Sequence, residues 1–289
     1  MNRLVFILLQ IYFVSIEANS DVVYYFGENK IKSSHNLKII SLAPSITETL
    51  YAIGIGEWII GVTRYDDFPE DVRNKEIIGG YIDVDVEKIL KLSPDVVVCE
   101  PNSGIKESVQ FLSSKGIPVL VVNINSIKDI LEAIEDFGRL FGKEREAREL
   151  LNNLLVKYKN LQKYYRGNNN RSMLSALVVL NENPLMVAGY SSFVGELINL
   201  VGLENAYKGR QKYPVLDIEL LHILRPDIIF NISELVMAGG SAEENKKSLL
   251  IFGGKIIYDL RDSTFIRPSP RFVDALEKLC SLISGYYCY

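Results

Sequence analysis

Short runs of apolar residues alternate with segments of helical periodicity along most of this chain. The apolar runs have the length of strands, and they occupy 37–42, 59–62, 96–98, 119–122, 176–180 and 228–230. Between them, apolar residues recur every three or four positions, which predicts amphipathic helices. Continuous apolar runs are typical of strands in a parallel sheet whose two faces are covered by helices. The pattern therefore predicts an α/β fold.

Two local patterns near the start of the chain make more specific predictions. A Gly-Glu-Asn turn between 22–26 and 30–32 predicts a short hairpin. Pro44 opens a helix, and Ser45 and Glu48 have the spacing of a capping box. We therefore expect Ser45 to cap this helix.

The stretch from Ser126 to about Tyr165 carries no strand signal. It has helical periodicity rich in Leu, Glu, Lys and Arg, with breaks at Gly138 and Gly142. This predicts one helix that ends near Gly142 and a long helix from Lys143 that crosses between two lobes. The predicted division is a signal segment over 1–20, an N-terminal lobe over 21–142, a linking helix over 143–166 and a C-terminal lobe over 167–289.

A segment of the first half of the chain recurs in the second half. Residues 81–95 and 213–227 both carry Tyr, Asp, Glu, Leu, Pro and Asp at the same spacing, and each segment runs into a β-branched strand. A shorter match joins 48–54 to 196–202, each predicted as a short helix that ends at glycine. A solenoid would need several short stacked repeats. The two copies instead predict two Rossmann-like lobes, each with a central parallel sheet, and a ligand cleft between them.

Residues 1–20 have the order of a secretory signal. Arg3 precedes an apolar stretch over 4–16, and small residues follow it. The apolar stretch is short for a bilayer span, so we expect export, with a retained membrane anchor as the alternative. Export would make two Asn-X-Ser sequons, at Asn170 and Asn231, candidate glycan sites, and chance explains them equally well.

The composition is ordinary for a folded protein and excludes several functions. The formal net charge is -4 and no basic run is present, so we expect no nucleic-acid partner. Three cysteines are too few for a disulfide scaffold, and a bridge between Cys280 and Cys288 stays open. The two histidines, His35 and His222, supply neither a catalytic constellation nor a metal-ligand set. We therefore expect no enzyme, no cofactor and no resident metal.

Several motifs together resemble one known family. They are the strand and helix over 39–50, the loop over 61–69, the two repeated segments and Arg267-Pro-Ser-Pro-Arg271. In this order they resemble the helical-backbone (class III) substrate-binding proteins of ABC importers, which capture vitamin B12, ferric siderophores or haem outside the membrane. Within that class the chain is most similar to the vitamin B12 (cobalamin) binding proteins. The resemblance implies an exported protein that delivers a cobalamin-like corrinoid to an ABC permease dimer, and we expect a monomer.

The resemblance also implies which residues contact the ligand. In the cobalamin binders, the positions that match Tyr65, Tyr81 and Tyr213 carry aromatic residues at the cleft. Aromatic rings suit a flat macrocycle because they offer a large rigid surface with a polar tip, and packing at the lobe edges is the alternative. Glu100 and Met186 stand where aromatic residues are common in those proteins. A carboxylate at Glu100 favours a polar or cationic ligand feature, or is a solvated strand end.

Phe265 and Arg267 match a segment of the C-terminal lobe that contributes ligand contacts in such proteins. An arginine at this place can donate hydrogen bonds to an amide, a phosphate or a carboxylate. A surface ion pair explains Arg267 equally well.

Glu87 and Glu219 lie two residues after Asp85 and Asp217, which are predicted to cap helices. An acidic residue stabilises the first turn of a helix by about 0.3–1 kcal/mol, which is a complete structural explanation for both glutamates. In the resembled family, however, one exposed glutamate per lobe docks onto arginines of the permease. The duplicated spacing fits this role, because a two-fold symmetric permease needs one equivalent anchor from each lobe.

A ferric-siderophore or haem binding protein is the main alternative, because its fold and docking glutamates would be the same. Arg64, Arg210 and Arg267 would then supply positive charge for an anionic chelate. A zinc or manganese binder would need several histidines with carboxylates. A surface adhesion or scaffolding protein without a small ligand is a further hypothesis, which saturable binding of a small molecule would exclude.

Overall fold

The computed structural model describes residues 23–26, 36–101, 103–166, 174–233, 256–260 and 262–287. The chain divides into two compact units. The first comprises Met1–Ile124 and Lys128–Asn153, and the second comprises Asn125–Ile127 and Leu154–Tyr289. Each unit has its own β-sheet. The predicted α/β fold with two lobes is confirmed.

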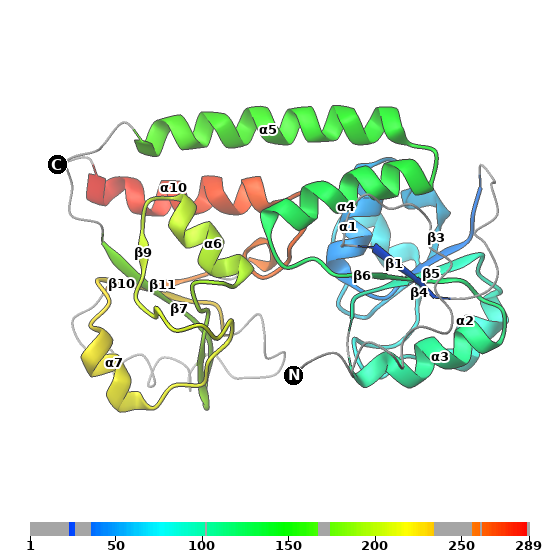
Figure 1. The fold of residues 1–289 in the computed structure, drawn as a ribbon, viewed down its shortest axis with the longest axis horizontal. Helices are drawn as coiled ribbons and strands as arrows, with labels where there is room; N and C mark the ends of the chain where they lie inside the picture. The colour runs from blue at the N-terminus through cyan, green and yellow to red at the C-terminus, as the bar shows by residue number, and fades with distance from the viewer. Residues whose placement is uncertain are drawn as a thin grey trace, which may run out of the picture. The chain divides into compact units, whose positions relative to one another are not determined.

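The first unit is built on a six-stranded sheet with the order β1-β6-β5-β2-β3-β4 (Figure 1). Its strands are β1 (Val23–Phe26), β2 (Ile39–Ser41), β3 (Ile59–Val62), β4 (Glu76–Ile77), β5 (Val96–Cys99) and β6 (Val119–Val122). β1 pairs antiparallel with β6, and the other pairs are parallel. The predicted hairpin partner of β1, at 30–32, lies outside the described residues.

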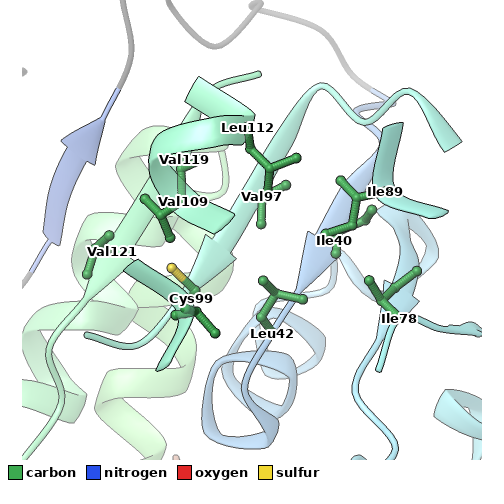
Figure 2. Packing of buried hydrophobic residues seen from close by; sticks show 11 residues of the cluster. Ile40, Leu42, Ile78, Ile89, Val97, Cys99, Val109, Leu112, Val119 and Val121 are labelled. Atoms are coloured by element: carbon green, nitrogen blue, oxygen red, sulfur yellow. The ribbon is translucent and has the colours of Figure 1, made fainter. Parts of the chain in front are cut away.

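Helices cover both faces of this sheet. α1 (Pro44–Ala52) and α4 (Ile127–Leu140) lie on one face, and α2 (Val86–Leu92) and α3 (Lys106–Ser114) lie on the other (Figure 1). The short 3-10 helices are η1 (Gly56–Trp58), η2 (Glu70–Asn74) and η3 (Ser103–Ile105). Figure 2 shows the core under α2 and α3, where Ile40 and Val97 from the sheet pack with Ile89 and Leu112 from the helices. All four side chains are fully buried. Burial on both faces explains why the strands read as continuous apolar runs.

A single long helix joins the two units. α4 ends at Leu140, and α5 runs over Glu144–Arg166. Gly142 between them has a φ of 67°, a left-handed conformation that favours glycine. The boundary between the units falls inside α5, between Asn153 and Leu154.

The second unit is built on a five-stranded sheet with the order β11-β10-β7-β8, in which β9 also pairs with β7. Its strands are β7 (Ser175–Glu182), β8 (Leu185–Val187), β9 (Glu204–Asn205), β10 (Ile228–Asn231) and β11 (Ile256–Asp259). Only the β7–β8 pair is antiparallel among the described strands of this sheet. The helices are α6 (Phe193–Leu200), α7 (Ile218–Leu224) and α10 (Phe272–Tyr287), with the 3-10 helix η5 (Ser263–Phe265). α6 and α10 lie on one face of the sheet and α7 on the other (Figure 1).

Several predictions about export and processing concern residues that the structure does not describe. The signal segment over 1–20, Asn170 and Cys288 are among them. In the described ranges, no helix is both long and apolar enough to cross a membrane. Asn231 is only 2% exposed, and its side-chain amide donates a hydrogen bond to Glu182 Oε1 at 2.8 Å. The folded chain therefore does not present the Asn231 sequon for glycosylation.

Candidate functional site

The first unit has a topological switch point between β2 and β5. From β2 the chain continues through β3 to β4, whereas from β5 it continues in the opposite direction to β6. In open α/β sheets, ligands bind at such a point, outside the carboxyl ends of the strands. Ser45 lies in the first turn of α1, soon after β2, and Glu100 directly follows β5. The topology therefore identifies Ser45 and Glu100 as candidate site residues.

The carboxylate of Glu100 connects these two strand ends. Its Oε1 accepts a hydrogen bond from the Ser45 hydroxyl, and its Oε2 accepts one from the Tyr81 hydroxyl at 2.9 Å. Burial raises the pKa of Glu100 above its ordinary value, and the hydrogen bonds from Ser45 and Tyr81 oppose that shift. Glu100 thus holds the polar end of Tyr81 and leaves the ring to form the exposed surface.

The position of Ser45 shows that the predicted capping box is wrong. The N-cap of α1 is Ala43, and no side chain caps the helix. A capping side chain must come from the residue that precedes the first helical turn. Ser45 lies inside that turn, is 3% exposed and donates its hydroxyl to Glu100. We did not predict Ser45 as a site residue, although its place soon after a buried strand was a usable signal.

An ion pair joins the two loops that carry Tyr65 and Tyr81. Arg64 donates from Nη1 and Nη2 to the two carboxylate oxygens of Asp83, at 3.1 Å and 2.7 Å. The Arg64 guanidinium carbon also lies 5.9 Å from the centre of the Tyr65 ring, a cation–π contact. Gly80 permits this approach, because a Cβ there would collide with both charged groups. Tyr65 is 46% exposed and Tyr81 is 38% exposed, so both rings offer surface to a ligand.

The second unit has its own switch point, between β7 and β10. β8 and β9 pair with β7 on one side, and β11 lies beyond β10. Glu182 ends β7, and its Oε1 accepts hydrogen bonds from Asn231 Nδ2 at 2.8 Å and from Ser233 Oγ at 3.3 Å. Its Oε2 is buried and has no hydrogen-bond partner among the described residues. Each unit therefore carries one carboxylate at its switch point.

Tyr213 and Met186 belong to one edge of the second unit. The Val187 N–H donates to the Pro214 carbonyl at 3.0 Å, and Met186 pairs antiparallel with Val215. Because side chains alternate along an extended segment, Tyr213 and Val215 point away from the core into which Pro214 packs. Tyr213 is 51% exposed and Val215 is 61% exposed. Met186, Tyr213 and Val215 thus contribute apolar surface at this edge.

Phe265 and Arg267 occupy different environments. Phe265 is 3% exposed and lines a small apolar pocket with Phe230 and Leu279. This burial assigns Phe265 to the core of the second unit, and the ligand surface proposed below does not include it. The Arg267 side chain is partly buried, and its backbone N–H donates to the Ser263 carbonyl at 3.1 Å. A ligand contact by Arg267 stays a prediction.

Both predicted docking glutamates are exposed. Glu87 lies in the first turn of α2 and Glu219 in the first turn of α7. Asp85 caps α2 by accepting a hydrogen bond from the Lys88 N–H at 2.9 Å. Asp217 is the N-cap of α7, but its side chain accepts no such bond. The duplicated sequence therefore produces the same helix position in both units.

A comparison with known proteins decides the family. The family model described as periplasmic binding protein matches residues 39–249. The chain belongs to this family. The resemblance stated from the sequence is thereby confirmed.

Relatives of this periplasmic binding protein carry different names. YvrC of Bacillus subtilis, an uncharacterized ABC transporter substrate-binding lipoprotein, is 27% identical over 250 residues, which cover 85% of this chain and 79% of YvrC. A vitamin B12-binding protein of Vibrio campbellii is 25% identical over 256 residues, which cover 88% and 92% of the two chains. The solved structure of the periplasmic heme-binding protein RhuT of Roseiflexus matches with a TM-score of 0.74 at 23% identity, covering 85% and 97%. The fold is thus shared by proteins named for different ligands.

Replacing Glu100 with glutamine is expected to change how the stability of the protein depends on pH. Because burial raises the pKa of Glu100, the folded protein binds this proton more tightly than the unfolded chain does. The contribution of Glu100 to stability is therefore present at low pH and is lost as the pH rises from its unfolded-state pKa through its raised folded-state pKa. Glutamine does not ionise, so the free energy of unfolding of E100Q should rise relative to wild type between about pH 4 and pH 8.

Urea denaturation of both proteins at the two pH values measures this difference. E107Q is a matched control, because Glu107 is an exposed glutamate in the first turn of α3. An E100Q-to-wild-type difference that stays constant with pH would contradict the prediction.

Proposed function

We propose that this periplasmic binding protein captures a corrinoid of the cobalamin class and delivers it to an ABC importer. The observation that carries the proposal is the pair Tyr81 and Tyr213, which occupy the same position of the internal repeat and are both well exposed. Each unit therefore offers a rigid aromatic surface that suits the face of a flat macrocycle. The vitamin B12-binding protein of Vibrio campbellii, a relative over most of this chain, supports the choice of ligand.

We further propose Tyr65, Tyr81 and Glu100 as the ligand contacts of the first unit, and Met186, Tyr213 and Arg267 as those of the second. The first group is supported by its place at or beside the switch point between β2 and β5. The exposed edge that Met186 and Tyr213 share supports the second group.

The delivery step is assigned to Glu87 and Glu219, which we propose as anchors for an ABC permease. Their matched positions at the start of α2 and α7 support one equivalent contact from each unit. The relative from Bacillus subtilis, named as an ABC transporter substrate-binding lipoprotein, supports an importer as the partner. The proposal includes export of the chain, directed by the segment over 1–20.

A haem or ferric chelate is the second candidate for the ligand. The likeness to RhuT supports it at the level of the fold. Against it, Arg64 already forms a bidentate ion pair with Asp83, which reduces the positive charge available for an anionic chelate.

Isothermal titration of the purified chain with cyanocobalamin tests the proposal. Saturable binding is expected if the chain captures a corrinoid. Haemin and a ferric siderophore are titrated separately under the same conditions. Saturable binding of haemin or the siderophore without binding of cyanocobalamin would reject the corrinoid, and no saturable binding of any of the three would reject ligand capture.

A further inference from the structure

We propose that the ion pair of Arg64 and Asp83 positions the ligand-contacting tyrosines of the first unit before a ligand arrives. Those tyrosines are Tyr65 and Tyr81, and all four residues belong to the first unit. The inference rests on the proposed function, in which both rings contact the ligand, and it names the residues that position them. A binding surface that is already ordered in the free protein loses less conformational entropy when the ligand binds.

Tyr81 lies where the chain reverses direction. Gly79 pairs antiparallel with Val84, so the chain turns back over the residues between them. The hydrogen bond from the Tyr81 hydroxyl to Glu100, at 2.9 Å, fixes only the tip of the side chain. A second attachment comes from the carboxylate of Asp83, on the returning part of the turn. The turn that carries Tyr81 is therefore held at two places.

Arg64 attaches this turn to the loop that carries Tyr65. Its backbone N–H donates to the Gly79 carbonyl at 2.9 Å, so the loop and the turn are adjacent. Its guanidinium donates to both carboxylate oxygens of Asp83, at 3.1 Å and 2.7 Å. The guanidinium carbon also lies 5.9 Å from the centre of the Tyr65 ring. One side chain thus contacts both the turn of Tyr81 and the ring of Tyr65.

The ion pair is suited to positioning more than to stabilising the fold. The Arg64 and Asp83 side chains are 47% and 57% exposed. Exposed ion pairs contribute little to folding stability, whereas two parallel N–H···O bonds restrict the orientation of both side chains. The hydrogen bond from Arg64 lowers the pKa of Asp83 below its ordinary value, so the pair is charged at neutral pH. Loss of the pair should therefore affect ligand binding more than stability.

Gly80 offers a way to displace the pair without removing either charge. A Cβ at this position would collide with Arg64 Nη1 and Asp83 Oδ1, which are the ends of flexible side chains and can move aside. Gly80 does not have a positive φ, so alanine can adopt its backbone conformation. We therefore expect G80A to fold and to displace the ion pair, which makes Gly80 a positioning residue as well.

Isothermal titration with cyanocobalamin tests the inference in R64A, D83A, G80A and the double variant R64A/D83A. Each single variant should bind about three- to tenfold more weakly than wild type does, and thermal melts check that it folds. The double variant should bind about as weakly as R64A or D83A alone, because both substitutions remove the same interaction. E76Q is the matched control, because it breaks an exposed ion pair of the same unit, Lys88–Glu76 at 2.8 Å, which joins neither tyrosine loop. Its affinity should stay within about twofold of wild type.

D83A separates positioning from a direct contact between Arg64 and the ligand. If Arg64 bound an anionic group of the ligand, removal of Asp83 would release the guanidinium, and D83A would bind as tightly as wild type or more tightly. That result would overturn the inference. Wild-type affinity in both R64A and G80A would overturn it as well.

A measurement on the ligand-free protein distinguishes failure of this inference from failure of the proposed function. NMR relaxation of ¹³C-labelled tyrosine rings reports how ordered Tyr65 and Tyr81 are, with Y65F and Y81F used for assignment. Both rings should be less ordered in R64A and D83A than in wild type, whereas Tyr213 in the second unit should be unchanged. If wild type does not bind cyanocobalamin, the corrinoid proposal fails, and this measurement alone decides the inference. Equal order of both rings in wild type and the variants would overturn positioning whether or not cyanocobalamin binds.

Discussion

Replacing Tyr81 or Tyr213 with alanine is expected to weaken ligand binding by about 10- to 100-fold, which corresponds to about 1.4–2.8 kcal/mol. Large aromatic side chains dominate binding energy because they bury a large rigid surface at a small cost in conformational entropy. Both rings are well exposed, at 38% and 51%, so their removal should leave the folded state intact. Isothermal titration gives the affinities, and thermal melts report on folding.

Two further variants distinguish the contribution of the Tyr81 ring to binding from that of its hydroxyl, and from the effect of removing an exposed aromatic residue elsewhere. Y81F keeps the ring and loses the hydrogen bond to Glu100, so its loss should be smaller than that of Y81A. F111A removes a comparable exposed aromatic residue, 44% exposed on α3, and should bind ligand normally. Unchanged affinity in both Y81A and Y213A would contradict the proposed aromatic surfaces.

Substituting Glu87 and Glu219 together with lysine is expected to reduce transport by about tenfold or more while ligand affinity stays within about twofold of wild type. The reason is that the introduced lysines would repel the arginines proposed on the permease, whereas neither glutamate is proposed to contact the ligand. Each single variant should retain part of the transport, because the other unit keeps its anchor. The measurement is ligand uptake into proteoliposomes that contain the permease, combined with titration of the free protein.

The matched control for this experiment is E107K. Glu107 has the same exposed, first-turn position in α3, and E107K changes the net charge by as much as each single variant of Glu87 or Glu219 does, so transport should be normal. Normal transport by the double variant of Glu87 and Glu219 would reject the docking assignment. Weakened ligand binding by the double variant would show that these residues act on the ligand site instead.

Local sequence patterns predicted the elements well, because strands and helices differ in how often apolar residues recur. The run at Val96–Cys99 forms a fully buried strand, and the long helix starts one residue after the predicted Lys143. The repeat also predicted that Tyr81 and Tyr213 occupy equivalent positions in the two units. These features depend on residues close together in the chain.

Site features that depend on long-range pairing could not be predicted in the same way. Glu182 is part of no motif, and it stands out only once the strand order shows a switch point between β7 and β10. Ser45 matched a capping pattern, yet its hydroxyl is bound by Glu100, 55 positions away in the chain. Phe265 precedes a recognisable motif but lies in the core, because η5 packs against α10. Strand order and tertiary packing determined all three outcomes.

The most direct test of ligand capture is native mass spectrometry of the purified protein in an equimolar mixture of cyanocobalamin, haemin and a ferric siderophore. Direct competition in one solution removes differences between separate titrations. The account predicts a single complex with the mass of one protein and one cyanocobalamin, and loss of that complex when both Tyr81 and Tyr213 are alanine. A complex with haemin or the siderophore alone, or no complex at all, would contradict it.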